Sequence, residues 1–513
     1  MFIQGCLLDI AAVLSCLGYG FALARMVGIG VNLGDAGVLG LISLALAGCA
    51  IHFAWALTST VHIVAMAAGL VLCAFYWREL IRGYRQSPWS IMAGLSAFFH
   101  MQALVNYDNG LYHLPTIKWN TEFPIIAGLA NLHGRLAFNS TLFLIAPLDD
   151  RADIGWVSNL ILLTFVLMSC TARFWQLRRK SVEIWFMILA AGAMALLPER
   201  LHLLGVWNAD GFAAILVLYW FCIAVSLPSR SPADIPLLLL TATFALTVKL
   251  SAAPLFPLAL LAGWFYRKAP DVRLLKPALF AGVFLGCWIA RGMVLSGCAM
   301  YPFSQSCVFS LPWAVSRTAA RNEVLAIRFW ARVHSWFGFE NVVSSWAWLT
   351  RQWIYRSWED WSAKLFVAGG IIGCIAVPGR ARANRVALAC AAGLCMCLAY
   401  WFLGAPDVRF GSGYLDAFGI LGLSFACAAV FGEAEVAQRL TFQAVFAAML
   451  FGTGGLIYSN NTWTIKGRPP YTTKVGPGGK LIGVPLEGDQ CWDHPLPCTP
   501  YFRPDDLKRV RWR

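Results

Sequence analysis

The chain has 513 residues, of which 59% are hydrophobic and only 13% are charged. Soluble domains carry about a quarter charged residues, and a soluble chain of this length would divide into several domains, each with a polar shell. The composition therefore excludes an ordinary soluble protein. The net charge of +14 does not indicate a nucleic-acid partner, because Lys and Arg collect in the cytoplasmic loops of membrane proteins. The expected partner is the lipid bilayer.

Apolar runs recur along the whole chain at close to the length of about 20 residues that crosses a bilayer. The candidate spans are residues 6–26, 37–56, 60–77, 89–105, 154–172, 182–198, 209–227, 234–250, 251–266, 277–296, 364–378, 386–404, 411–431 and 440–458. They predict an all-α polytopic membrane protein with about 12–14 transmembrane helices. Two prolines within 249–261 predict a broken or re-entrant pair there. No Lys or Arg precedes Arg25, so the first run is expected to be a retained span.

Basic residues divide the loops into two sets. The loops 77–89, 172–181, 266–276 and 379–385 are dense in Lys and Arg and are assigned to the cytoplasm. The alternate segments are then external. This predicts a transmembrane domain of residues 1–458, with external loops 106–153 and 297–363, followed by an external tail, 459–513.

Most of the 16 cysteines lie in apolar spans, where they act as small buried hydrophobes. Four lie in predicted external segments, as two short-range pairs: Cys298 with Cys307, and Cys491 with Cys498. An external, oxidising compartment favours disulfides. We therefore expect two disulfide bonds, the second of which would staple the tail.

The first external loop begins "NYDNGLYHLPTIKW", with Asp108 at its edge. Its apolar residues recur near helical spacing between Pro115, Pro124 and Gly128, which predicts short helices along the membrane interface. Asp108 is either the N-cap of such a helix or a catalytic carboxylate. The candidate substrate-binding residues of this loop are Tyr107, Tyr112, His113, Lys118, His133 and Arg135.

Further charged residues recur at the predicted external ends of spans. Asp210 is either an N-cap or a second catalytic carboxylate, and Lys249 either snorkels or binds substrate. Arg291 lies within a span, where a charge is a functional hypothesis by default. Asp407 and Arg409 share a short turn, where they either pair with each other or present Arg409 to a phosphate.

The remaining candidates lie in the second external loop and the tail. Tyr301 stands in "YPF", and Arg332 in a segment whose periodicity predicts an amphipathic helix. Asp489 and Trp492 belong to the tail, which forms either a lid that contacts a polar substrate or a structural clip. His113, His133 and His202 lack the tight spacing of a metal site, so no metal ligand is assigned and no cofactor is expected. No nucleotide-binding motif is present.

This arrangement resembles the C-type glycosyltransferases, multi-span enzymes that use lipid-linked sugar donors. The stretch "WIARGMVLSGCAMYPF" is similar to a run found in many of them, with Gly292 in place of the usual Asn. The stretches "YDNGLYHLPTIKW", "NLHGRLAFNS", "FWAR", "APDVRFG" and "GDQCWDHPLPCTPY" more closely resemble a bacterial family of polytopic proteins grouped with surface-polysaccharide loci. Many C-type enzymes carry paired acids in the first loop, whereas Asn109 follows Asp108 here. This departure counts against a divalent metal, which is possible but unsupported, and it leaves open whether Asp210 supplies a second carboxylate.

The resemblance implies an inverting transfer from a polyprenyl-phosphate-linked sugar to a glycan or lipid acceptor, on the periplasmic face of a bacterial inner membrane. Asp108 would be the general base, with a pKa raised by burial. Lys249, Arg291 and Arg409 would stabilise the leaving phosphate. Two alternatives remain at this stage: a transporter or flippase for a lipid-linked or polar solute, and a lipid-linked polysaccharide polymerase or ligase.

Overall fold

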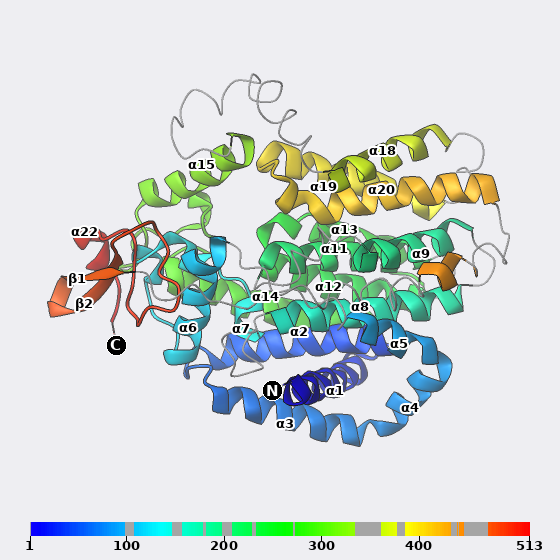
Figure 1. The fold of residues 1–513 in the computed structure, drawn as a ribbon, viewed down its shortest axis with the longest axis horizontal. Coiled ribbons are helices and arrows are strands. Elements are labelled where there is room, and N and C mark those ends of the chain that lie inside the picture. The colour runs from blue at the N-terminus through cyan, green and yellow to red at the C-terminus, as the bar shows by residue number, and fades with distance from the viewer. Residues whose placement is uncertain are drawn as a thin grey trace.

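The computed structural model describes residues 2–97, 107–145, 156–177, 181–196, 208–227, 232–269, 272–333, 361–376, 385–431, 439, 441–445 and 470–512. The described chain is mostly helical (Figure 1). Its main helices are α1 (Phe2–Val27), α2 (Leu33–Ile51), α3 (Ser59–Phe75), α4 (Trp77–Gln86), α5 (Pro88–Ser96), α8 (Trp156–Gln176), α9 (Ser181–Leu196), α11 (Ala209–Ser226), α12 (Ile235–Val248), α13 (Leu255–Tyr266), α14 (Leu275–Ser296), α15 (Arg317–Val333), α18 (Trp361–Ala376), α19 (Arg385–Gly404) and α20 (Val408–Phe431).

Six of these helices are long and apolar enough to cross a membrane: α1, α2, α11, α14, α19 and α20. The pair α3 and α4 becomes a seventh if its 70° bend lies within one span. Shorter apolar helices cover Val182–Met194, Ile235–Val248 and Leu250–Tyr266. The larger predicted number of spans stays a prediction, because several of the others form short helices or fall partly outside the described residues. The predicted break near the two prolines is present, since α12 ends at Val248 and α13 begins at Leu255.

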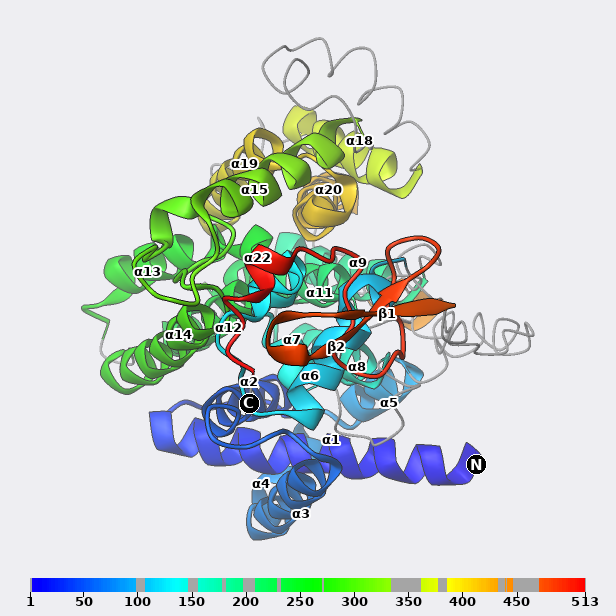
Figure 2. The same ribbon diagram turned by 90° about the vertical axis from the view of Figure 1, so that its left-hand side faces the viewer.

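Most of the long helices run side by side in layers, and α1 crosses them (Figures 1 and 2). Helices α1–α3 form one side, α8, α9, α11 and α12 the middle, and α18–α20 the other side. Because α11 and α12 are consecutive and antiparallel, the start of α11 lies beside the end of α12. Polar residues occur at both ends of this hairpin, while its middle is almost entirely buried and apolar.

A buried charge cluster holds one end of the hairpin. The guanidinium of Arg173, from α8, donates to Asp35 of α2 at 2.8 Å and to Asp234, just before α12, at 2.6 Å. It also donates to Ser226 at the end of α11, and the Tyr219 hydroxyl donates to the other oxygen of Asp35. The Arg173 side chain is fully buried. One arginine therefore joins four helices, which a charge can do in an apolar interior only when its partners neutralise it.

A second, smaller core lies at one end of the helices and joins the first loop to the tail. It contains Trp119, Ile125, Leu129 and Leu136, packed against tail residues that include Ile482 and, further on, Leu507 and Val510. The loop folds into a π-helical turn (Asn109–His113), α6 (Leu114–Glu122), two 3-10 turns (Leu129–Asn131 and Gly134–Ala137) and α7 (Leu142–Ile145). The prediction of short helices is confirmed. The apolar residues of these helices are buried in protein, and the position of the helices along a membrane interface stays a prediction.

The described chain is mostly helical, as predicted, and the tail adds one pair of strands to it. Strands β1 (Tyr471–Val475) and β2 (Leu481–Pro485) form an antiparallel hairpin in which Thr473 faces Gly483, and the short α22 (Pro504–Leu507) follows. Seen from that end of the molecule, the tail lies across α6 and α7 (Figure 2). The disulfide Cys491–Cys498 closes its central loop, and Cys298–Cys307 closes the turn after α14. Helix α14 itself ends at Gly297, whose φ of 77° is the left-handed conformation that glycine adopts freely.

The Arg173 cluster predicts a strong effect on stability. Replacing Arg173 by Met leaves Asp35 and Asp234 buried without their cation, which costs about 3–5 kcal/mol in comparable buried ion pairs. We expect Arg173→Met to lower the midpoint of thermal unfolding in detergent by many degrees. The exposed Arg85→Met variant is the matched control and should leave the midpoint unchanged. Equal midpoints for both variants would show that the cluster contributes nothing to stability.

Candidate active site

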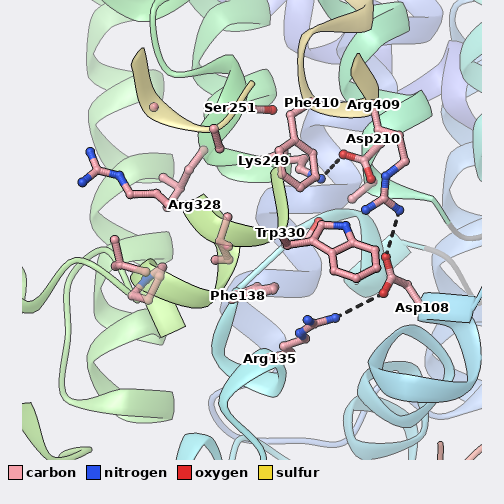
Figure 3. Close-up of a pocket in the computed structure, with 18 of the residues that line it drawn as sticks. Asp108, Arg135, Phe138, Asp210, Lys249, Ser251, Arg328, Trp330, Arg409 and Phe410 are labelled. Carbon is pink, nitrogen blue, oxygen red and sulfur yellow. Dashed lines mark hydrogen bonds and ion pairs between the residues drawn. The ribbon is translucent and has the colours of Figure 1, made fainter. Parts of the chain in front are cut away.

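A cavity of about 700 Å³ lies where the first loop, the hairpin end of α11 and α12, and helices α15, α19 and α20 meet (Figure 3). Most of its wall is apolar or aromatic, with contributions from Val324, Ile327, Trp401 and Phe410. Among its lining residues are two carboxylates and four cations: Asp108, Asp210, Arg135, Lys249, Arg328 and Arg409. The cavity is therefore apolar with a charged region, and cations outnumber carboxylates in that region.

Asp108 lies between two arginines that come from distant parts of the chain. Its Oδ1 accepts from Nη1 of Arg135 at 3.2 Å, and its Oδ2 accepts from Nη1 of Arg409 at 3.3 Å (Figure 3). The side chain is 14% exposed. Its backbone is already helical, and the side chain makes no capping hydrogen bond to the turn that follows. Capping therefore does not explain Asp108.

The charges around Asp108 set its ionisation. Burial by itself raises the pKa of this carboxyl. The His113 imidazole lowers it, as do the positive charges of Arg409, Arg135 and Lys249, and together they hold the pKa below its ordinary value of 3.8. The expectation of a raised pKa is thus wrong in its net direction. Nearby His113 carries no charge at neutral pH, because burial lowers the pKa of its imidazole to about 3. Asp108 is therefore a carboxylate throughout the physiological range.

Arg135 is held by a second acid that sequence reasoning missed. Its Nε lies 3.6 Å from Oε1 of Glu323 on α15, and its guanidinium carbon lies 5.6 Å from the centre of the Tyr112 ring. Burial raises the pKa of Glu323 above its ordinary value, although Arg135 partly offsets this. Glu323 could have been identified from the sequence, because it is one of the charged residues of the segment that was predicted to be an amphipathic helix.

The second carboxylate, Asp210, forms an ion pair with Lys249 across the hairpin end (Figure 3). Asn208, not Asp210, is the N-cap of α11, since its side chain accepts from the backbone N–H of Asp210 at 2.8 Å. The N-cap interpretation of Asp210 is therefore wrong by two residues. Lys249 also lies 4.5 Å from the centre of the Phe410 ring. The pair joins α11 to the end of α12 at the cavity. The Arg173 cluster joins the same two helices at their other ends.

The turn before α20 confirms the pairing of Asp407 with Arg409, while phosphate binding by Arg409 stays a prediction. Nε of Arg409 lies 3.6 Å from Oδ1 of Asp407, and the same oxygen accepts the backbone N–H of Arg409 at 2.9 Å. The guanidinium nevertheless reaches the cavity and Asp108. About a third of the Arg409 side chain is exposed, so this cation has room for a further anionic partner.

The structure brings one group of predicted residues together and leaves another apart. Tyr107, Asp108, Tyr112, Arg135, Asp210, Lys249, Tyr301 and Arg409 line the cavity. The cavity lining does not include His113, Lys118, His133, Arg291, Arg332, Asp407, Asp489 or Trp492. Aromatic, hydroxyl and cationic residues that sequence reasoning missed complete it: Phe138, Ser140, Phe143, Ser251, Arg328, Trp330, Tyr400, Trp401 and Phe410.

Arg291 has a structural position rather than a cavity position. It is buried, and its two terminal nitrogens donate to the amide oxygens of Asn139 at 2.6 Å and Asn120 at 2.9 Å. It thereby fixes the first loop to α14. Arg332 likewise donates to the backbone carbonyls of Leu403 and Gly404, which ties α15 to the end of α19.

The other predicted residues lie around the cavity. Lys118 pairs with Asp493 of the tail at 2.8 Å, and His113 shares a hydrogen bond with Asn109 beneath the site. Trp492 packs against Gly110, where any side chain would collide with the indole. Within the described part of the chain, no group of three or more His, Cys, Asp or Glu residues is placed to hold a metal ion.

Residues 6–415 match the model of a protein family described as a domain of unknown function, DUF8201. No curated protein and no solved structure matches the chain. The match includes every charged residue that lines the cavity, from Asp108 to Arg409, and it ends before the tail.

The ion pairs predict how the ionisation of Asp108 responds to substitution. Removing a cation that contacts the carboxylate disfavours its charged form, so Arg409→Gln should raise the pKa of Asp108. Labelling by a water-soluble carbodiimide, which attacks protonated carboxyls, measures this when labelled peptides are quantified across pH. We expect Asp108 to react at a higher pH in Arg409→Gln than in the native protein. Arg328→Gln, which removes a cavity cation without contact to Asp108, is the control. Identical labelling curves would contradict the pairing.

Proposed function

The chain belongs to the DUF8201 family, whose description assigns no chemistry. We propose that the protein is a membrane glycosyltransferase that moves a sugar from a polyprenyl-phosphate donor to a glycan or lipid acceptor. The proposal places the protein in a bacterial inner membrane, with about 12–14 spans and the site facing the periplasm. The observation that carries it is the ionised Asp108 at the boundary between an apolar wall and a cluster of cations.

The lining of the cavity is complementary to a lipid phosphate, which has an apolar chain and an anionic head. Apolar residues of α15 and α19, such as Ile327 and Leu403, suit an isoprenoid chain. Lys249 and Arg409 lie where the apolar wall meets the acids, and an arginine fork binds phosphate oxygens in pairs. A soluble nucleotide sugar would make no use of the apolar wall. A lipid-linked donor uses both parts.

In this proposal Asp108 acts as the general base. The acceptor hydroxyl oxygen attacks the anomeric carbon, and its proton passes to Asp108. The bond between the anomeric carbon and the phosphate oxygen breaks, and its electron pair stays with the phosphate. Lys249 and Arg409 stabilise the charge that develops there. A single displacement of this kind inverts the anomeric centre.

The arginines also offer a way to free the base when substrate binds. The Arg409 guanidinium donates to Asp108 and also forms an ion pair with Asp407. A donor phosphate competes with Asp108 for the same guanidinium, and loss of that contact raises the basicity of the carboxylate. Asp210 remains paired with Lys249 and positions this lysine, rather than supplying a second base.

Transport is a second candidate, because charged groups are not confined to the cavity end. A separate cavity of about 780 Å³ lies at the start of α2, and Arg25, Asp35, Glu79 and Arg82 are among its lining residues. The other end of α2 packs against Leu144 of α7, beside the candidate site. The two cavities share no lining residue, and the buried apolar middle of α11 and α12 lies between their charged ends. Transfer at one face is therefore preferred.

The base assignment is tested by Asp108→Asn. A positioned general base contributes about 10²–10⁴-fold in rate, so the variant should lose at least about 100-fold in transfer. The assay follows sugar transfer from a lipid extract of the source membrane by mass spectrometry. Asp505→Asn, an exposed carboxylate in the tail, is the control and should keep full activity. Full transfer by folded Asp108→Asn would exclude this residue as the base.

Deleting the gene distinguishes the transferase from its alternatives. Mass spectrometry of the surface glycans should show the loss of one decorating sugar while the polymer length is kept. Loss of all polymer length would indicate a polymerase or ligase instead. A complete glycan trapped inside the membrane would indicate a flippase.

A further inference from the structure

The tail brings a second cluster of polar groups to the edge of the cavity. The carboxylate of Asp489 accepts a hydrogen bond from the hydroxyl of Tyr107, and the Tyr501 hydroxyl lies 3.5 Å from its other oxygen. Tyr107 and Tyr501 are 56% and 45% exposed. We call these three residues the tail shelf. It is a carboxylate flanked by two accessible aromatic rings.

The shelf is fixed relative to Asp108. Tyr107 directly precedes Asp108 and also lines the cavity, so the shelf and the candidate site share one residue. The side-chain amide of Gln490 donates to the Tyr107 carbonyl at 2.6 Å, and the backbone N–H of Trp492 donates to the Gly110 carbonyl at 2.9 Å. On the far side, the Tyr501 ring stacks on His133, with 5.3 Å between ring centres.

Residues other than those of the shelf hold the tail in its folded position. Cys491, Trp492, His494 and Cys498 are all buried, and a clip that only holds the tail in place needs nothing more. Exposed rings add little to such a clip, since aromatic residues stabilise a fold mainly by burying area. The exposure of both tyrosines beside a carboxylate indicates a surface built for a ligand.

The chemistry of the shelf selects the ligand class. Its carboxylate repels phosphate and accepts hydrogen bonds from hydroxyl groups. Flat aromatic faces pack against the apolar C–H faces of sugar rings. The donor phosphate would occupy the cationic part of the cavity, so an acceptor must reach Asp108 from another direction. The shelf adjoins Asp108 through Tyr107 and meets this requirement.

We propose that the tail shelf binds the saccharide part of the acceptor, and so orients its hydroxyl toward Asp108. The identification of the bound saccharide as an acceptor rests on the proposed function. Saccharide binding at the shelf does not depend on transfer. It also assigns a role to the tail, a part of the chain that lies beyond the family match. Acceptor selection would then reside outside the shared domain, and the donor site within it.

The test measures saccharide binding by the full chain in lipid nanodiscs, without donor. The probe is the oligosaccharide mixture released by mild acid from the envelope of the source bacterium, and native mass spectrometry detects bound species. We expect binding by the native protein, and a weakening of about tenfold or more in Asp489→Asn and in Tyr501→Ala. Asp505→Asn removes another tail carboxylate and should bind normally. Non-reducing peptide mapping of Cys491–Cys498 and a thermal melt establish that each variant is folded.

The outcomes separate this inference from the proposed function. Asp108→Asn should still bind the oligosaccharide while losing transfer. Transfer with unchanged saccharide binding in both shelf variants would overturn the shelf and leave the transferase intact. Shelf-dependent binding without any transfer would support the shelf and exclude the transferase. No saccharide bound by the native protein would overturn the shelf.

Discussion

The ion pairs of Asp108 with Arg135 and Arg409 connect the parts of the molecule that make its cavity. Arg135 belongs to the first loop and Arg409 to the start of α20, which lies 301 residues after Asp108 in the chain. Because the side chain is mostly buried, neither arginine can be removed without leaving charge unbalanced in a poorly solvated place. The same contacts keep Asp108 ionised. One ionised acid thus links two cations of the cavity that come from distant parts of the chain.

The α11–α12 hairpin provides the frame on which this site is built. Asp210 and Lys249 close it at the cavity, while Ser226 and Asp234 meet Arg173 at its other end. Between these points the hairpin is apolar and buried, so the polar ends define its register. Arg291 of α14 holds the first loop through two asparagines. The charged residues that were predicted to bind substrate therefore fall into two groups. Some line the cavity, and others hold the surrounding segments in position.

Sequence reasoning located much of the site because charge is rare in this chain, so the few acids and cations between apolar runs stand out. Asp108, Asp210, Lys249 and Arg409 were found in this way. It could not separate Arg409 from Arg291, because hydropathy gives the depth of a residue but not the direction of its side chain. The aromatic wall, including Trp330 and Phe410, was missed since aromatic residues are common throughout the chain. The tail hairpin was missed because its turn-rich sequence was interpreted only as a stapled loop.

The proposed transfer requires that the cavity bind a lipid phosphate with its phosphate on the cations beside Asp108. Electron cryomicroscopy of the full chain in nanodiscs that contain a polyprenyl phosphate would locate this ligand. We expect phosphate density in contact with Arg409 and Lys249, and an isoprenoid chain along the wall formed by α15 and α19. Density in the opposite cavity beside Arg25 and Arg82, with the Asp108 cavity empty, would contradict it.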